Sequence, residues 1–240
     1  MVDTVTVIVP TKNEADNIGF FLATLPDEIC LIVVDDSDDD TPELISTLRP
    51  QNTRLLRLPG NISEARQEGA SQARTPWLLF ADADVEFAEG YFNLLPELLA
   101  VDMVYGTKLS RDDYQSYYHR FRSGQRMLDW LGIPAATGSN LLVRRDVFHA
   151  VGGFDLTLSV NEDSELAWRI KRNGYCVRFA PQLVVFERDH RRLAQGTWRK
   201  TFHSLIRCTL LFAGLMPQKW RRDDWGYWTE RETSARENHY

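Results

Sequence analysis

Asp82 and Asp84 stand two residues apart, and their types and spacing point most directly to chemistry. They follow Trp77–Ala81, an apolar run with the length and composition of a buried strand. In an extended chain, residues i and i+2 point to the same side, so both carboxylates can face one point. Two convergent carboxylates repel each other unless a cation lies between them, and oxygen ligands of this kind suit Mg²⁺ or Mn²⁺. The alternative is a solvated turn, where Asp is common.

Polar residues also follow two earlier apolar runs. Thr11 lies just beyond Val5–Val9, which we expect to be a strand that stops at a proline, and Asp35 and Asp36 follow Cys30–Val34. Strand patterns alternate with helical patterns, which predicts βαβ units and a mainly parallel sheet. Such sheets bind ligands beyond the carboxyl ends of their strands, so these residues are expected to share a site. The sequence contains no GxGxxG or GxxxxGK[ST] motif, which disfavours a dinucleotide site or a P-loop.

Other segments are expected to position that site. Asn13 and Ser63 are candidate helix caps, and Glu162 with Asp163 opens an amphipathic helix in which acids also favour the helix dipole. Residues 111–129 are expected to be irregular or helical and to lie over the site. The remaining predicted elements are strands at Arg54–Leu58, Met103–Thr107 and Leu141–Val143, helices at Ser63–Ala73, after Pro42 and from Glu89 to Leu99, and paired strands at Tyr175–Phe179 and Leu183–Phe186.

Composition narrows the class of protein. The 240 residues are 43% hydrophobic with a net charge of −6, and residues 1–100 hold 18 acids against six bases. Such an acidic half would repel nucleic acid, so no nucleic-acid partner is expected, while a cation site is compatible with it. The three cysteines are widely spaced and predict neither a disulfide framework nor a zinc site. No leader-like N-terminus and no apolar run of membrane-spanning length are present, which predicts a cytoplasmic protein.

The C-terminal stretch leaves two interpretations open. Trp198, Phe202, Leu205 and Phe212 recur at helical spacing, and basic residues and tryptophans accompany them across residues 198–222. A helix of this composition can rest on an anionic membrane, which would place the protein peripherally at the inner face. The other interpretation, an apolar stripe that packs as ordinary core or as a dimer contact, is the more common fate of such stripes.

Several of these segments together resemble family 2 glycosyltransferases, the inverting group with the GT-A fold. The matching segments occur in the family's order and cover about three-quarters of the chain: VIVPTKNE at Val7–Glu14, VVDDSDDDT at Val33–Thr41, EARQEGASQA at Glu64–Ala73, FADADV at Phe80–Val85, TGSNLLVRRDVF at Thr137–Phe148, GGFD at Gly152–Asp155 and NEDSELAWRIKRNGY at Asn161–Tyr175.

The resemblance implies an α/β fold of GT-A type, with a Rossmann-like, mainly parallel central sheet flanked by helices. It implies a glycosyltransferase domain over residues 1–190, divided into a nucleotide-sugar-binding half (1–107) and an acceptor or catalytic half (108–190). Residues 191–240 lie outside the resemblance, and their helical spacing predicts a C-terminal helical extension. The implied reaction moves a sugar from a nucleotide-sugar donor, UDP-linked by expectation, to an acceptor hydroxyl on a saccharide or a lipid-linked molecule.

The resemblance also assigns roles to residues. Asp163 would be the general base, and the neighbouring Glu162 would tend to raise its pKa. Asp84 and Asp82 would hold Mn²⁺ or Mg²⁺, with His190 as the best match for a further ligand. Gln67 stands where the family places Asn. The residues implied to contact the nucleotide sugar are Pro10, Thr11, Glu14, Asp35, Asp36, Arg66 and Asp82.

Two other functions fit parts of this pattern. A nucleotidyltransferase also uses aspartates at strand ends and a metal, but it would usually carry a glycine-rich phosphate loop near the N-terminus, where this chain has Val7–Lys12. A non-catalytic nucleotide-sugar-binding module would be favoured if Asp82, Asp84 or Asp163 were missing, and all three are present.

Overall fold

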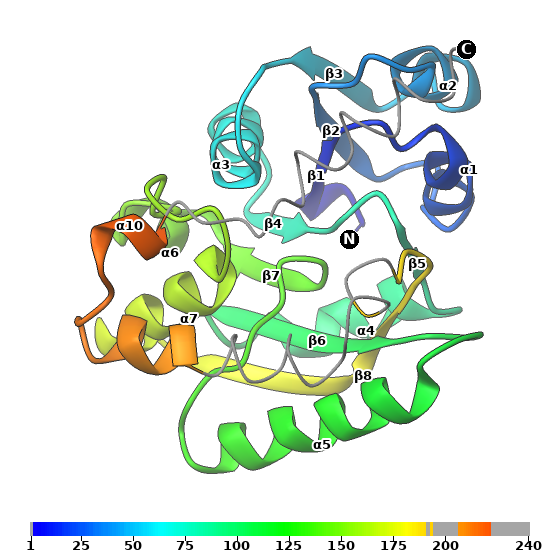
Figure 1. Cartoon of the computed structure of the whole chain (residues 1–240). Helices are drawn as coiled ribbons and strands as arrows, with labels where there is room; N and C mark the ends of the chain where they lie inside the picture. Colours follow the sequence, from blue (N-terminus) through cyan, green and yellow to red (C-terminus); the bar gives the residue numbers. More distant parts are fainter. Residues whose placement is uncertain (1, 191–192, 194–205, 222–240) are drawn as a thin grey trace.

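One mixed sheet forms the centre of the molecule (Figure 1). The computed structural model describes residues 2–190, 193 and 206–221. Within them, eight strands pair in the order β3-β2-β1-β4-β7-β6-β8-β5. The neighbours β3, β2, β1 and β4 pair in parallel, as do β6 and β8. Strand β7 is antiparallel to both β4 and β6, and β5 is antiparallel to β8. The parallel half is the βαβ arrangement that the alternating pattern predicts.

Strands and helices mostly alternate along the chain, except that β5 directly follows β4 and α7 directly follows α6. The strands are β1 Val5–Thr11, β2 Cys30–Asp35, β3 Thr53–Arg57, β4 Trp77–Phe80, β5 Val85–Phe87, β6 Met103–Leu109, β7 Leu141–Arg144 and β8 Val177–Glu187. The helices are the 3₁₀ turn η1 Val2–Thr4 and α1 Ala15–Ala23, α2 Thr41–Leu48, α3 Ile62–Gln72, α4 Tyr91–Leu98, α5 Gln115–Trp130, α6 Arg145–Ala150, α7 Glu162–Arg172 and α10 Gln218–Arg221.

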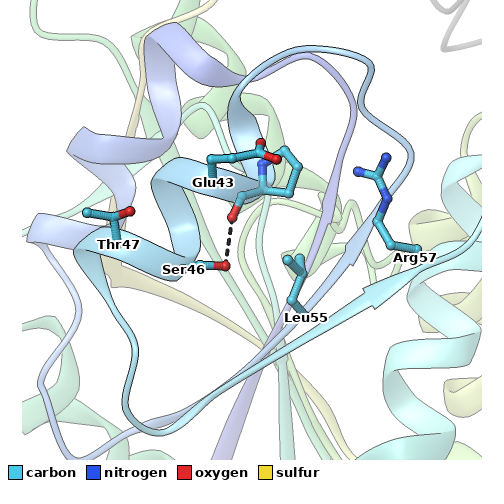
Figure 2. A pocket seen from close by; sticks show the side chains of 6 residues that line it. Glu43, Ser46, Thr47, Leu55 and Arg57 are labelled. Atoms are coloured by element: carbon cyan, nitrogen blue, oxygen red, sulfur yellow. Dashed lines mark hydrogen bonds between the residues drawn. The ribbon is translucent and has the colours of Figure 1, made fainter.

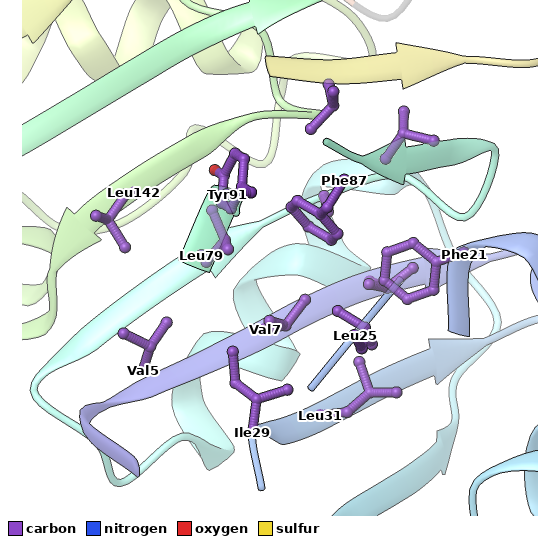
Figure 3. Close-up of a cluster of buried hydrophobic side chains, with 14 of the residues drawn as sticks. Val5, Val7, Phe21, Leu25, Ile29, Leu31, Leu79, Phe87, Tyr91 and Leu142 are labelled. Atoms are coloured by element: carbon purple, nitrogen blue, oxygen red, sulfur yellow. The ribbon is translucent and has the colours of Figure 1, made fainter. Parts of the chain in front are cut away.

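Each face of the sheet has its own hydrophobic core. Alternate residues of β1 separate cleanly, with Val7 in one cluster and Ile8 in the other, as the period of two in a strand requires. The first cluster, drawn in Figure 3, packs the sheet against α1, α2 and α4. The second packs it against α3, α6 and α7. Gly69 lets α3 approach the sheet, because a Cβ there would lie only 2.4 Å from Ile8 Cγ2.

Three local predictions are wrong. β1 continues through Pro10 to Thr11, so proline does not end the strand; its residues 10 and 11 still pair with β2. Asn13 does not cap α1: it has a left-handed backbone (φ 54°), and its side chain accepts from the backbone N–H of Asp38. The cap of α3 is Asn61 instead of Ser63, because Asn61 and Glu64 form a reciprocal capping box.

A fourth correction concerns β8. The segments Tyr175–Phe179 and Leu183–Phe186 do not pair with each other; residues 177–187 form one continuous strand. It runs parallel to β6 with a register shift between Gly106 and Thr107, which absorbs the irregularity around Pro181. Residues 111–129, expected to be irregular or helical, are largely the helix α5.

The described part of the C-terminal stretch packs on the domain. Residues 206–212 are helical, and the Phe212 ring stacks on Trp168 of α7 at a centroid distance of 4.8 Å. Arg207 is buried, and its Nε donates to Asn161 Oδ1 over 3.2 Å. Trp198, Phe202 and Leu205 of the predicted stripe lie outside the described residues. None of the helices in the described part of the chain is long and apolar enough to cross a bilayer.

Candidate active site

The carboxyl ends of β1, β2 and β4 lie beside one another, because these strands are parallel neighbours. Thr11 and Asp35 are register partners at the ends of β1 and β2, and the Thr11 hydroxyl donates to Asp35 Oδ1 over 2.6 Å. Asp82 follows the end of β4 by two residues. The topology therefore brings three of the sequence-predicted site residues to one edge of the sheet.

The two adjacent acids after β2 differ in their surroundings. Asp35 is buried, accepts from the Ser37 hydroxyl over 2.6 Å and forms an ion pair with Arg57. Asp36 is partly exposed, and its Oδ2 lies 3.0 Å from Lys12 Nζ. Asp35 therefore fixes the loop beyond β2, and Asp36 is the carboxylate of the pair that is more accessible to a ligand.

The first strand and helix hold two further predicted residues. Pro10 is buried within β1, where it is the register partner of Val34 in β2. Glu14 is buried at the start of α1, where its backbone N–H donates to Thr41 Oγ1 and its Oε2 accepts from the Asn17 amide, both over 2.9 Å. Glu14 is thus a fixed part of the site wall.

A hollow of about 540 Å³ lies between α2 and β3 (Figure 2). No pattern in the sequence predicts this hollow. Of its lining, Arg57 reaches the predicted site, through its ion pair with Asp35 and its donation to the Ser37 carbonyl. The lining residues are Pro42, Glu43, Ser46, Thr47, Leu55 and Arg57.

Arg66 links the two halves of the candidate site. Its side chain is only 2% exposed, and it pairs with Asp82 over 2.5 Å and with Glu162, 96 residues further along the chain. Burial alone would lower the pKa of Arg66, but the charges of Asp82, Glu162 and Asp163 outweigh it and raise that pKa. Gly138 leaves the space this arrangement needs, since a Cβ there would lie 2.3 Å from Arg66 Nη1.

Glu162, which is buried, and Asp163, which is partly exposed, form an acidic pair at the start of α7. Burial, followed by the charge of Asp163, raises the pKa of Glu162 to about 7 against the opposing charge of Arg66. Burial also raises the pKa of Asp163, although its Oδ2 accepts from the backbone N–H of Gly138 and its Oδ1 from that of Ser164, each over 2.6 Å. A carboxylate that is held in place and has a raised pKa is suited to accept a proton.

Asp84 is a buried acid that lies among other acids. Its Oδ1 has no hydrogen-bond partner among the described residues. Burial raises the pKa of Asp84 well above its usual range, and the charges of Glu187, Glu14 and Asp82 raise it further, while Lys108 opposes them. An unpaired carboxylate oxygen facing other acids is costly unless a cation is bound there.

His190 lies in the same neighbourhood, held by residues that sequence reasoning missed. Its Nε2 is 3.0 Å from Ser110 Oγ, and its Nδ1 is 3.4 Å from the Tyr118 hydroxyl. That hydroxyl donates to Glu187 over 2.8 Å, and Lys108 Nζ lies 2.5 Å from the same Glu187 oxygen. The one available signal was the acid at the end of an apolar strand in LVVFERDH (183–190), the pattern already recognised at β2 and β4.

The residues around Asp84 fit a divalent cation that a ligand helps to bind. Within the described residues, no three His, Cys, Asp or Glu side chains form a ready metal site by themselves. Asp82 is oriented towards Arg66, which leaves Asp84 with its unpaired oxygen as the clearest protein ligand. Mg²⁺ and similar ions commonly bind through one or two carboxylates, with phosphate oxygens of the substrate completing the shell.

Comparison with known proteins identifies the family to which this chain belongs. The family model described as "Glycosyl transferase family 2" matches residues 6–157, and that of "Glycosyl transferase family group 2" matches residues 101–231. The chain therefore belongs to glycosyl transferase family 2. This confirms the predicted family and, with it, the glycosyltransferase class of enzymes.

Two curated relatives are similar over most of the chain. The Pre-mycofactocin glycosyltransferase of Mycobacterium tuberculosis is 27% identical over 218 residues, which are 83% of this chain and 46% of the relative. The Succinoglycan biosynthesis protein ExoA of Rhizobium meliloti is 26% identical over 216 residues, 80% of this chain and 66% of the relative. The chain thus spans about half to two-thirds of the length of these relatives.

Solved structures confirm the GT-A type of fold. The mannosyltransferase PcManGT from Pyrobaculum calidifontis, in complex with GDP-Man and Mn²⁺, aligns with a TM-score of 0.67 and 22% identity over 92% of this chain and 72% of its own. Residues 1–349 of S. aureus TarS, in complex with UDP-GlcNAc, align with a TM-score of 0.64 and 17% identity over 96% of this chain and 73% of that one.

Proposed function

We propose that this chain transfers a sugar from a nucleoside-diphosphate sugar to an acceptor hydroxyl with inversion at the anomeric carbon, using a divalent cation and Asp163 as the general base. Asp84 carries the proposal: its buried oxygen without a partner, among acids that raise its pKa, fits a cation bound to a donor diphosphate. Mn²⁺ or Mg²⁺ would be held by Asp84, with Asp82 and His190 as the proposed further ligands.

The donor would lie along the edge formed by β1, β2 and β4. Thr11, Asp36 and Arg66 are the proposed contacts to the nucleotide, with Asp35 and Glu14 shaping the wall beside them. A UDP-linked donor is expected, and a GDP-linked donor is the alternative; the structural neighbours include complexes with UDP-GlcNAc and with GDP-Man. We assign residues 1–107 to this donor half and residues 108–190 to the acceptor half.

Asp163 would take the proton of the acceptor hydroxyl. The acceptor oxygen would form its bond to the anomeric carbon on one face while the bond to the diphosphate breaks on the other. The N–H groups of Gly138 and Ser164 orient the carboxylate, each leaving lone-pair capacity on its oxygen. A bound cation would supply charge neutralisation for the departing diphosphate. Arg66 would hold Asp82 and Glu162 in fixed relation across the two halves.

The products formed from a panel of UDP- and GDP-linked sugars test this proposal. With Mn²⁺ and water as a poor acceptor, the chain should slowly release a free sugar and a nucleoside diphosphate, and NMR should show the inverted anomer first. Release of a sugar phosphate and a nucleoside monophosphate would indicate chemistry at the phosphate instead. Binding of a donor without any turnover, with or without candidate acceptors, would leave a non-catalytic binding module.

A further inference from the structure

The C-terminal end of α5 exposes three large apolar side chains together. Trp130 is 83% exposed, Met127 58% and Leu131 55%. They lie one and three or four positions apart, so they share one stretch of the helix surface. In Figure 1, α5 runs along the bottom edge of the molecule, outside β6 and β8.

The opposite side of α5 attaches the helix to the rest of the domain. Tyr118 and Gln125 are buried; the Tyr118 hydroxyl donates to Glu187, and Gln125 Nε2 donates to the Ala135 carbonyl over 2.9 Å. The helix is therefore fixed by its inner side, and the outer apolar residues are not needed to attach it to the sheet.

The charge of α5 contrasts with that of the chain. Its sixteen residues include three arginines, Arg120, Arg122 and Arg126, and a single acid, Asp129. Asp129 accepts from the Tyr105 hydroxyl over 3.2 Å, whereas Arg120 and Arg126 are exposed. A basic helix on a chain of net charge −6 is complementary to an anionic surface.

The end of α5 is also connected to the proposed catalytic residues. Gly138, whose backbone N–H donates to Asp163 Oδ2, lies seven positions after Leu131. Within that connection, the Ala136 carbonyl accepts from Ser164 Oγ over 3.2 Å. The extended chain from Leu131 to Gly138 spans at most about 25 Å. A surface that contacts the end of α5 is therefore close to the acceptor side of the site.

We propose that the Met127–Leu131 end of α5, with its arginines, rests on an anionic lipid bilayer. Three side chains of this size bury a few hundred Å² at most, well below the roughly 800 Å² per partner of a stable protein interface. An interfacial helix needs only a few apolar residues, a tryptophan among them, and basic residues for the headgroups. This contact would present the acceptor side of the site to the membrane surface. It differs from the contact predicted at residues 198–222, whose Phe212 stacks on Trp168.

Vesicle flotation of the full chain tests this assignment. Vesicles of phosphatidylcholine with about 30% phosphatidylglycerol should bind the protein at low salt, and binding should weaken as salt screens the arginines. The paired substitution Met127→Ser and Trp130→Ser should weaken binding roughly tenfold or more, the scale of losing two inserted side chains. Leu48→Ser, at a residue of α2 that is 55% exposed, is the matched control and should leave binding unchanged.

A second pair of variants tests the charge. Arg126→Glu should weaken binding to anionic vesicles, whereas Arg54→Glu, at an exposed position of β3, should change it much less. Three results would overturn the proposal: wild-type protein that does not bind anionic vesicles at low salt, α5 variants that bind as wild type does, or a wild-type dimer that the α5 variants convert to monomer. The last would show that a second copy covers this surface. Neither vesicle binding nor the oligomeric state depends on sugar transfer. The membrane proposal can therefore fail while the proposed function stands.

Discussion

Arg66 offers the sharpest test of how the two halves of the site are held together. Its guanidinium is 2% exposed and lies between Asp82 and Glu162. Arg66→Met keeps most of the apolar volume and leaves the buried Glu162 carboxylate without its counter-ion. Removing one partner of a buried ion pair costs about 3–5 kcal/mol, which for a protein of this size lowers the melting temperature by roughly 10 °C. Arg66→Met together with Glu162→Gln should recover much of that loss, because the buried Glu162 charge is gone and Asp82, with its side chain 28% exposed, still reaches solvent.

The same variant should change the pH dependence of stability. The pKa of Glu162 is raised from 4.5 to about 7, so its contribution favours the folded state fully below about pH 4.5 and is lost as pH rises towards 7. Removing Arg66, whose charge lowers that pKa, should extend the loss to higher pH. The penalty of Arg66→Met should therefore be larger near pH 8.5 than near pH 5.5, and Glu162→Gln should reduce that difference, leaving the part due to Asp163, whose pKa the charge of Arg66 also lowers.

Thermal and urea unfolding at the two pH values measure these effects, with Arg144→Met as the matched control. Arg144 also pairs with two acids, Asp102 over 2.7 Å and Asp146 over 2.6 Å, but its side chain is 41% exposed. Exposed pairs contribute at most about 1 kcal/mol, so this control should be nearly neutral. Equal losses in the two variants, or no recovery in the double variant, would refute the reasoning.

Three further predictions concern catalysis. Asp163→Asn should lower sugar transfer by about 10²–10⁴-fold with little change in donor affinity, and a collapse of affinity without loss of turnover would make Asp163 a binding residue. Gly138→Ala should destabilise the fold by about 1–3 kcal/mol and impair transfer, because its Cβ would lie 2.3 Å from Arg66 Nη1, whereas Gly124→Ala, with open space around its Cβ, should be tolerated. Transfer should increase with pH as Asp163 loses its proton, with a midpoint above the usual range for an aspartate because burial raises its pKa, so a midpoint within or below that usual range would contradict its role as base.

The parallel half of the fold and the positions of its strand ends could be predicted from sequence patterns. The runs before Thr11, Asp35 and Asp82 are buried strands, and the mixed sheet is of the expected type. The strand order was beyond reach, because β7 and β5 enter antiparallel through pairings between distant segments. Local propensity could not decide that β8 is a single strand, since only the register shift against β6 makes its continuity possible.

The candidate site shows a similar division. The acids at the strand ends were visible in the sequence because buried strands seldom finish in charge. The pairing of Arg66 with Glu162 was not, since it joins residues 96 positions apart that only the fold brings together. Glu187 and Lys108 were overlooked because nothing in the sequence shows that they pair, since the fold alone brings the ends of β6 and β8 together across 79 positions.

Calorimetric titration of the chain with UDP, with and without Mn²⁺, tests the central claim most directly, and a GDP titration covers the alternative donor. Wild-type protein should bind the nucleotide much more tightly with the metal. Asp84→Ala should reduce that metal-dependent affinity by at least about 100-fold, since losing even an outer-shell partner of a metal costs 10–100-fold. Its melting temperature should not fall, because the variant removes a buried carboxylate that faces Glu187 and Glu14. Asp146→Ala, at an exposed acid, should bind as wild type does. Unchanged metal-dependent affinity in Asp84→Ala, or wild-type binding that ignores Mn²⁺, would contradict the account.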